Sequence, residues 1–280
     1  MAQAAPAPAL AGLVGAYVGF EERADRPLLR RETPSENVTL IVNFGVPLEV
    51  GEVGGEREGF AGSFLARISE LPAVTAFTGV SAGVQIDLSP LGAHMLLDLP
   101  MDELPEPVVA LGEVLGREGE RLADRLAALG DWELRFDYLD SLFLTRFAAA
   151  RAPQPSVAWA WRALIGSGGT IPIGALTDRL ACSPRHLIEG FRHQVGVAPK
   201  QAAAIIRFGR AARRLRAPEV TPLSRLALEC GYHDQSHMTR DFHRFAGATP
   251  AAFAAARHAG YLGVDETKVN SVQDGAASAA

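Results

Sequence analysis

Residues able to carry nucleophilic or metal chemistry are few in this chain. The two cysteines are Cys182 and Cys230, with no Cys-x-x-Cys pair and no Cys/His cluster at zinc-ligand spacing. Both occupy positions beside predicted turns that are often apolar, so we expect small buried side chains rather than reactive thiols. His94 is the first of the seven histidines, and we expect it to be capped or half-buried. The sequence predicts no metal, no cofactor and no disulfide framework, which favours a reducing, cytoplasmic location.

Charge is the stronger chemical signal. The net charge is −5, but Met1 to Ala152 holds 12 basic and 23 acidic residues (−11), whereas Pro153 to Gly260 holds 14 and 6 (+8). This asymmetry indicates that the second half meets a polyanion and that the first half does something else. Hydrophobic residues make up 48% of the chain, which is typical of a folded protein. The first ten residues lack the features of a secretory signal, and no apolar run approaches the ~20 residues of a membrane helix, so we expect no membrane partner.

The first half is predicted to be mainly β from Leu13 to about Leu99 and helical after Pro107. Strands are expected where β-branched and apolar residues lie between Gly-rich turns, and helices where apolar residues recur at helical spacing. The expected strands are Asn37–Phe44, Ala73–Thr78 and Gly83–Leu88, and the expected helices are Val108–Leu115, Glu118–Leu129 and Trp132 to about Ala150, the last capped by Asp131.

The last of these helices carries a wide apolar stripe. It consists of Trp132, Phe136, Leu139, Leu142, Phe143 and Phe147. Such a stripe is usually core, so packing on its own domain is favoured over dimerisation through the same face.

An internal repeat organises the second half. Residues match at an offset of 50 to 51 positions, with the offset changing by one at a turn. The matched pairs are Leu176/Leu226, Leu180/Cys230, Leu187/Met238, Phe191/Phe242, Gly196/Gly247 and Pro199/Pro250. Each unit has a short helix, a tight turn, a second helix and then Gly and Pro, which is the pattern of a helix-turn-helix.

The turn residues fit this pattern. In the second unit Ala227 allows close helix crossing, Gly231 can adopt a positive φ and Asp234 can cap the following helix. In the first unit Ser183 is the expected cap and Pro184 the first helical residue. Between the units, Pro199–Arg216 is predicted to form one helix of 18 residues. At ~1.5 Å per residue it is about 27 Å long, close to the ~34 Å between successive major-groove faces on one side of a duplex.

Over about Val157 to Ala259 the sequence resembles the AraC/XylS family of transcription regulators. The resemblance is carried by Leu176–Phe191 (LTDRLACSPRHLIEGF) and Leu226–Phe253 (LALECGYHDQSHMTRDFHRFAGATPAAF). Two positions of the first unit depart from the usual pattern, with Thr177 in place of a small Ala and Ala181 in place of the turn Gly. The N-terminal half is more loosely similar to the β-rich sensor domains attached to this module, especially along residues 82–97.

The resemblance implies which residues meet DNA, because the second helix of each unit would lie in the major groove. Base contacts are expected from Arg185, Ile188, Glu189, Gln235, Ser236, Thr239 and Arg240, and phosphate or secondary contacts from His186, Arg192, His237 and Arg244. Arg can pair with guanine, Gln with adenine and Glu with cytosine. The alternative for these polar residues is a solvated helix face. Leu187, Phe191, Met238, Phe242 and Phe245 are expected in the core.

We therefore predict an α+β chain: a β-rich sensor-like domain with a helical linker region (residues 10–152), an all-α domain with two helix-turn-helix units joined by a long helix (153–260), and a disordered tail (261–280).

The expected function is a sequence-specific DNA-binding transcription regulator that responds to a ligand and is not an enzyme. Its expected partner is double-stranded promoter DNA, with RNA polymerase, a small-molecule effector and a second copy of the chain as further candidates. The alternative is a DNA-tethered enzyme for repair or metal-dependent chemistry. It is disfavoured because residues 1–152 contain no Cys and only His94.

Overall fold

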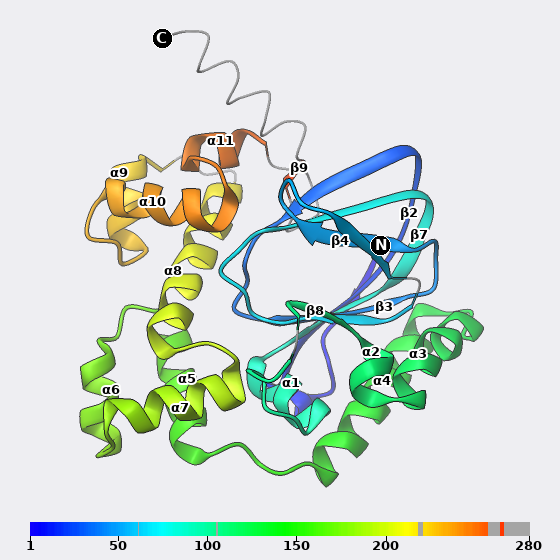
Figure 1. The fold of residues 1–280 in the computed structure, drawn as a ribbon, viewed down its shortest axis with the longest axis horizontal. Coiled ribbons are helices and arrows are strands. Elements are labelled where there is room, and N and C mark those ends of the chain that lie inside the picture. Colours follow the sequence, from blue (N-terminus) through cyan, green and yellow to red (C-terminus); the bar gives the residue numbers. More distant parts are fainter. Residues whose placement is uncertain (61, 105, 218–220, 257–263, 266–280) are drawn as a thin grey trace, which may run out of the picture.

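Two long antiparallel strands, β2 (Val14–Glu32) and β7 (Ala73–Leu88), form the spine of the N-terminal half. Figure 1 shows the fold of the computed structural model, which describes residues 1–60, 62–104, 106–217, 221–256 and 264–265. The register of β2 against β7 shifts between Ala24 and Leu28. Pro27 lies inside this irregularity, where a residue without a backbone N–H removes no regular ladder bond.

The other strands extend this pair into one antiparallel sheet, nine-stranded over the described residues, with the order β1-β2-β7-β3-β6-β8. The second half of β7 pairs with β3, whereas its first half pairs with β4, which in turn pairs with β5. A single strand therefore carries two different neighbours along its length, and the sheet folds over on itself (Figure 1). The bounds are β1 Ala2–Ala4, β3 Val38–Asn43, β4 Leu48–Glu52, β5 Arg57–Phe60, β6 Phe64–Ala66, β8 Val108–Ala110 and β9 Val264–Asp265.

The alternation of side chains gives the sheet two different faces. Val38, Leu40 and Val42 of β3 belong to the main hydrophobic core, whereas Ile41 packs in a second, smaller cluster with Phe20, Val50, Phe60 and Phe64. The main core lies under the helices. The smaller cluster lies on the inner side of the folded sheet.

Helices cover the first of these faces. They are η1 (Pro8–Leu10), α1 (Pro90–Leu97), α2 (Leu111–Leu115), α3 (Arg117–Ala128) and α4 (Trp132–Ala149). The Tyr17 ring on β2 stacks on Phe136 and Phe143 of α4 at centroid distances of 5.7 and 6.4 Å. The Tyr17 hydroxyl also donates a hydrogen bond to Asp140 (2.7 Å). The apolar stripe of α4 thus packs on its own domain, as predicted.

The sequence-based elements of this half need correction in three places. Val108–Ala110 is not helical but forms β8, which pairs with β6, and the helix begins only at Leu111. The two strands expected within 73–88 are one continuous strand, bent at Gly79 (φ +105°). The helix α1 was not expected inside the segment predicted to be mainly β, because burial against α4 decides it rather than local pattern. The strand β2 lies within that segment, although its own bounds were not predicted.

The C-terminal half is helical as expected. Its helices are α5 (Pro155–Gly166), α6 (Ile173–Leu180), α7 (Pro184–Val195), α8 (Pro199–Arg216), α9 (Leu223–Glu229), α10 (Gln235–Ala246) and α11 (Pro250–Ala255). The long helix has the predicted bounds, and α10 begins directly after Asp234, as expected.

The predicted disordered tail lies outside the described residues except for Val264–Asp265, whose backbone pairs with β2 as β9. Among the helices that the structure describes, none combines the length and the apolar character needed to cross a membrane.

Candidate nucleic-acid interface

The two repeat units have matching ends, and these ends fix where each second helix starts and stops. The Ser183 hydroxyl accepts a hydrogen bond from the His186 backbone at the start of α7 (3.2 Å), and the Asp234 carboxylate accepts one from the His237 backbone at the start of α10 (2.7 Å). Both helices end at a left-handed glycine, Gly196 and Gly247. The repeat seen in the sequence is therefore a repeat of capping geometry.

The turns of the two units differ at the positions where the first unit departs from the family pattern. In the second unit Gly231 has φ +81°, whereas in the first Ala181 holds a left-handed conformation (φ 48°, ψ 40°) that strains a residue with a Cβ. Thr177 is buried where the second unit has Ala227. Its hydroxyl donates to the Gly174 carbonyl (2.8 Å), so the extra polar group is satisfied within its own helix.

Aromatic rings lock the second unit to the connecting helix. Phe208 of α8 lies 4.9 Å from Phe242 and 5.2 Å from Phe245, both on α10, and 6.3 Å from Phe253 on α11. All four side chains are buried. The direction in which α10 points is thus set by packing on α8 rather than by a flexible turn.

The second helix of the first unit exposes its N-terminal turn. Arg185, His186 and Glu189 are exposed and Ile188 is half-buried. The Arg185 guanidinium donates to the Glu189 carboxylate one turn later (2.7 Å), and this bond raises the pKa of Arg185. Two of the predicted base-contacting side chains therefore form one solvent-facing unit. Arg192, also exposed, lies farther along α7.

The second helix of the second unit exposes Gln235, Ser236 and Arg240, whereas Thr239 is half-buried and donates to the Gln235 carbonyl (2.9 Å). The hydrogen bond that the His237 backbone N–H donates to the Asp234 carboxylate lowers the pKa of Asp234. This turn therefore presents an amide, a hydroxyl and a guanidinium to solvent.

Two predicted phosphate contacts of α10 have other partners in this conformation. The His237 ring packs edge-on against Tyr232 at 5.1 Å. The Arg244 guanidinium lies 2.6 Å from the Glu70 carboxylate of the N-terminal half. One guanidinium nitrogen of Arg244 is thus engaged by Glu70 in this conformation.

The arginines of α8 have mixed roles. Arg207 is structural, because it donates to the Gly169 carbonyl (2.7 Å) and its guanidinium lies 5.8 Å from the Tyr232 ring. Arg214 pairs with Glu229 at 3.2 Å, and Arg213 pairs with Glu36 of the N-terminal half at 2.7 Å. Arg210 remains exposed.

The two halves of the chain touch through polar contacts that the sequence did not indicate. The Glu70 carboxylate accepts from the Gln201 side chain of α8 (2.8 Å) as well as pairing with Arg244. Arg31 donates to the Ala246 carbonyl at the end of α10 (3.2 Å). The backbone N–H of Met101 donates to the His193 carbonyl of α7 (2.8 Å). Both α7 and α10 are thus contacted by the N-terminal half, and no sequence motif marks Glu36 or Glu70.

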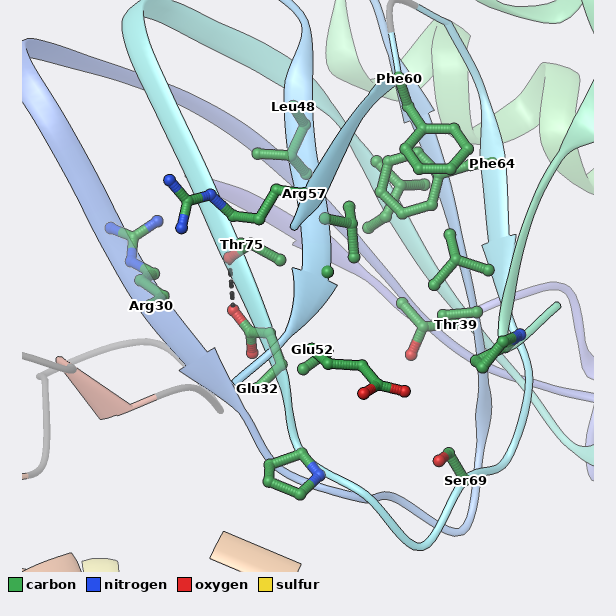
Figure 2. Close-up of a pocket in the computed structure, with 18 of the residues that line it drawn as sticks. Arg30, Glu32, Thr39, Leu48, Glu52, Arg57, Phe60, Phe64, Ser69 and Thr75 are labelled. Atoms are coloured by element: carbon green, nitrogen blue, oxygen red, sulfur yellow. Dashed lines mark hydrogen bonds between the residues drawn. The ribbon is translucent and has the colours of Figure 1, made fainter. Parts of the chain in front are cut away.

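A cavity of about 570 Å³ lies within the folded sheet. Its wall includes aromatic rings, threonines and serines, and several charged side chains, which Figure 2 shows converging from different strands. The labelled members are Arg30, Glu32, Thr39, Leu48, Glu52, Arg57, Phe60, Phe64, Ser69 and Thr75. Its size is that of a small-molecule site. The described residues include no group of three or more His, Cys, Asp or Glu that could hold a metal ion.

The remaining sequence expectations concern single residues. Cys230 is buried, as expected, and this burial raises the pKa of its thiol, whereas Cys182 is half-buried. His94 is half-buried, as expected, and its Nδ1 lies 2.9 Å from the Leu99 carbonyl oxygen. Leu187, Phe191, Met238, Phe242 and Phe245 are all in the core.

Known proteins share both halves of this architecture. Residues 176–256 match the family model of a helix-turn-helix domain. The HTH-type transcriptional regulator Rv1931c of Mycobacterium tuberculosis is 36% identical over 90 residues, which are 32% of this chain and 34% of that protein. This chain thus matches about a third of the length of that relative.

A solved structure of ToxT from Vibrio cholerae resembles the fold of most of the chain. The superposition covers 85% of this chain and 97% of that one, with a TM-score of 0.52 and 10% sequence identity. At this identity the likeness concerns the fold, a β-rich N-terminal half followed by a helical C-terminal half. The family model and the repeat geometry together show that residues 176–256 form a helix-turn-helix domain of the AraC type.

Proposed function

We propose that this protein is a cytoplasmic transcription regulator that reads two adjacent major-groove segments of promoter DNA and responds to a small molecule bound in its β-rich domain. The observation that carries the proposal is the repeated capping and exposure of α7 and α10, joined by one continuous helix, α8. With 18 residues, α8 is about 27 Å long at ~1.5 Å per residue. It can thus hold two reading helices at a separation near one turn of DNA.

Base reading is assigned to the exposed N-terminal turns. In this proposal Arg185 and Glu189 act as a pair in the first half-site, and Gln235, Ser236 and Arg240 read the second. Ile188 and Thr239 are half-buried, so only part of each side chain is available to DNA. Each can offer a methyl group for apolar contact with the methyl group of a thymine. His186 and Arg192 lie beside these turns as phosphate contacts.

The response to a ligand is assigned to the cavity and to the polar contacts between the halves. Segments 32–37 and 69–72 contribute lining residues, and Glu36 and Glu70, which bond to α8 and α10, lie within the same two segments. A ligand that shifts either segment therefore changes contacts made by the DNA-binding domain. The ligand needs different affinities for the paired and separated arrangements in order to act.

The test is a spacing and salt series on duplex DNA. Genomic fragments bound by the full chain define the two half-sites, and fluorescence anisotropy then measures affinity for duplexes with five extra base pairs between them. We expect this half-turn insertion to weaken binding strongly, because it places the half-sites on opposite faces. We also expect the logarithm of the association constant to fall linearly with the logarithm of salt concentration.

The paired variant Arg185→Ala/Arg240→Ala should bind all fragments poorly, whereas Arg26→Ala, an exposed arginine of β2, should bind as the parent does. Equal affinity for the inserted and parent duplexes, or the absence of a salt slope, would contradict the proposal.

A further inference from the structure

The cavity in the sheet has an excess of carboxylates. Its lining includes five glutamates and three arginines. The glutamates are Glu32, Glu52, Glu56, Glu58 and Glu106, and the arginines are Arg30, Arg57 and Arg67. Three of the glutamates come from the hairpin of β4 and β5, so one wall supplies most of the negative charge.

Two of the three arginines are already offset by carboxylates that do not line the cavity. One nitrogen of Arg30 donates to both carboxylate oxygens of Glu22 at 2.6 and 2.8 Å. Arg57 donates to Glu49 at 3.1 Å. Arg30 and Arg216 also act on Glu32 and offset its charge. Arg67 is then the lining arginine that faces the other four lining glutamates. The field inside the cavity is therefore negative, which favours a positively charged guest.

Two glutamates are placed to meet such a guest directly. Glu32 of β2 and Glu52 of β4 both line the cavity, and Figure 2 shows them coming from different strands, with Glu32 turned toward Thr75. Glu32 accepts a hydrogen bond from the Thr75 hydroxyl (3.2 Å), and its desolvation raises the pKa of the carboxyl. Glu52 forms no ion pair with any residue that the structure describes. Burial thus disfavours the charged form of Glu32, which a bound cation would favour, whereas Glu52 keeps acceptor capacity for a ligand.

The remaining wall is aromatic and aliphatic. Phe60 and Phe64 lie 5.0 Å apart, with their planes at 40° to one another, and Phe20, Leu48 and Val50 adjoin them in the same cluster. The faces of aromatic rings carry negative potential and attract cations, whereas the aliphatic side chains favour an uncharged body. The lining therefore suits a ligand with one charged and one apolar part.

We propose that the cavity binds an organic cation, namely a protonated amine or quaternary ammonium group carried on an apolar or aromatic body. The cation lies between Glu32 and Glu52, and the body packs on the Phe60 and Phe64 rings. This assignment rests on the proposed role of the cavity as the effector site, and it names the chemical class of the effector.

The experiment measures binding to the full chain in the absence of DNA. Phenylbutyl, naphthylpropyl and biphenylmethyl skeletons are each titrated by calorimetry as the ammonium, the alcohol and the carboxylate. Only the charge then changes within a series. We expect the ammonium form to bind at least tenfold more tightly than the carboxylate in at least one series.

Variants locate the site. Glu52→Gln and Glu32→Gln should each weaken ammonium binding about tenfold, the loss expected from one charge-assisted contact. Glu21→Gln removes an exposed carboxylate of β2 outside the lining and should leave binding unchanged. Thermal unfolding of each variant without ligand separates lost contacts from lost folding. Glu52 is exposed, so its variant is expected to fold.

Tighter binding of the carboxylates, lost in Arg67→Gln, would overturn the assignment in favour of an anion. Failure of every probe to bind would overturn it as well. If ammonium probes bind with the expected pattern but leave DNA affinity unchanged, the ligand class stands and the proposed regulatory coupling fails.

Discussion

Glu70 is the most informative residue to change, because one carboxylate holds both α8 and α10. Its oxygen lies 2.6 Å from the Arg244 guanidinium and 2.8 Å from the Gln201 amide. The substitution Glu70→Gln keeps an oxygen that can accept from Gln201 and removes the charge that attracts Arg244. If Arg244 contacts a DNA phosphate through the nitrogen that Glu70 holds, the parent protein must break this pair on binding, and the variant need not.

The expected gain follows from the exposure of the pair. The Arg244 side chain is 50% exposed and Glu70 18%. An ion pair of this kind contributes about 0.2–1 kcal/mol. Removing it should therefore raise DNA affinity by at most about fivefold.

The assay is fluorescence anisotropy on the parent, Glu70→Gln, Arg244→Ala and the double variant over a range of salt concentrations. The gain should vanish in the Arg244→Ala background, because the change acts through that side chain. Glu36→Gln, which frees Arg213 at the same boundary, serves as the matched control and should not change affinity to the same extent. A gain of the same size with and without Arg244 would refute the reasoning.

Three further predictions concern single positions. Arg240→Ala should reduce the free-energy discrimination between bases at one base pair by about 1–3 kcal/mol. A binding-site profile, selected from a randomised library, that is identical to the parent's would count against this contact. Ala181→Gly should raise the free energy of unfolding by about 0.5–1 kcal/mol, because the relief of left-handed strain exceeds the extra entropy of glycine in the unfolded chain. The control Ala212→Gly, inside α8, should lower the free energy of unfolding by about 1 kcal/mol. Chemical denaturation measures both changes. Iodoacetamide at neutral pH should alkylate Cys182 before Cys230. Burial shields the Cys230 thiol and raises its pKa, which reduces the fraction present as thiolate. Mass spectrometry after a short reaction gives the order.

Much of the C-terminal half could be predicted from the sequence because its signals are local. Ser183 and Asp234 cap the helices that follow them, and Gly196 and Gly247 end them. A cap or a left-handed glycine acts within three or four residues, so its type and spacing suffice to place it. The core positions follow equally well, since Leu187, Phe191, Met238 and Phe242 recur at helical spacing.

The N-terminal half was less accessible because its signals are long-range. The segment of β2 from Glu21 to Glu32 is rich in charge and contains a proline, which locally resembles a loop. It is a strand because β7, which is distant along the chain, supplies its pairing partners from Ala82 to Ala73. Local propensity is a weak guide when pairing decides the conformation.

The sequence by itself determined the two repeated units, their caps, the length of the connecting helix and the basic character of the DNA-binding half. Only the tertiary structure decided that Glu32 and Glu52 share one cavity, and that Glu70 reaches Arg244. Capping and helical periodicity are properties of adjacent residues and can be read along the chain. The convergence of distant carboxylates and cations depends on how the sheet folds over and docks, and no local spacing encodes it.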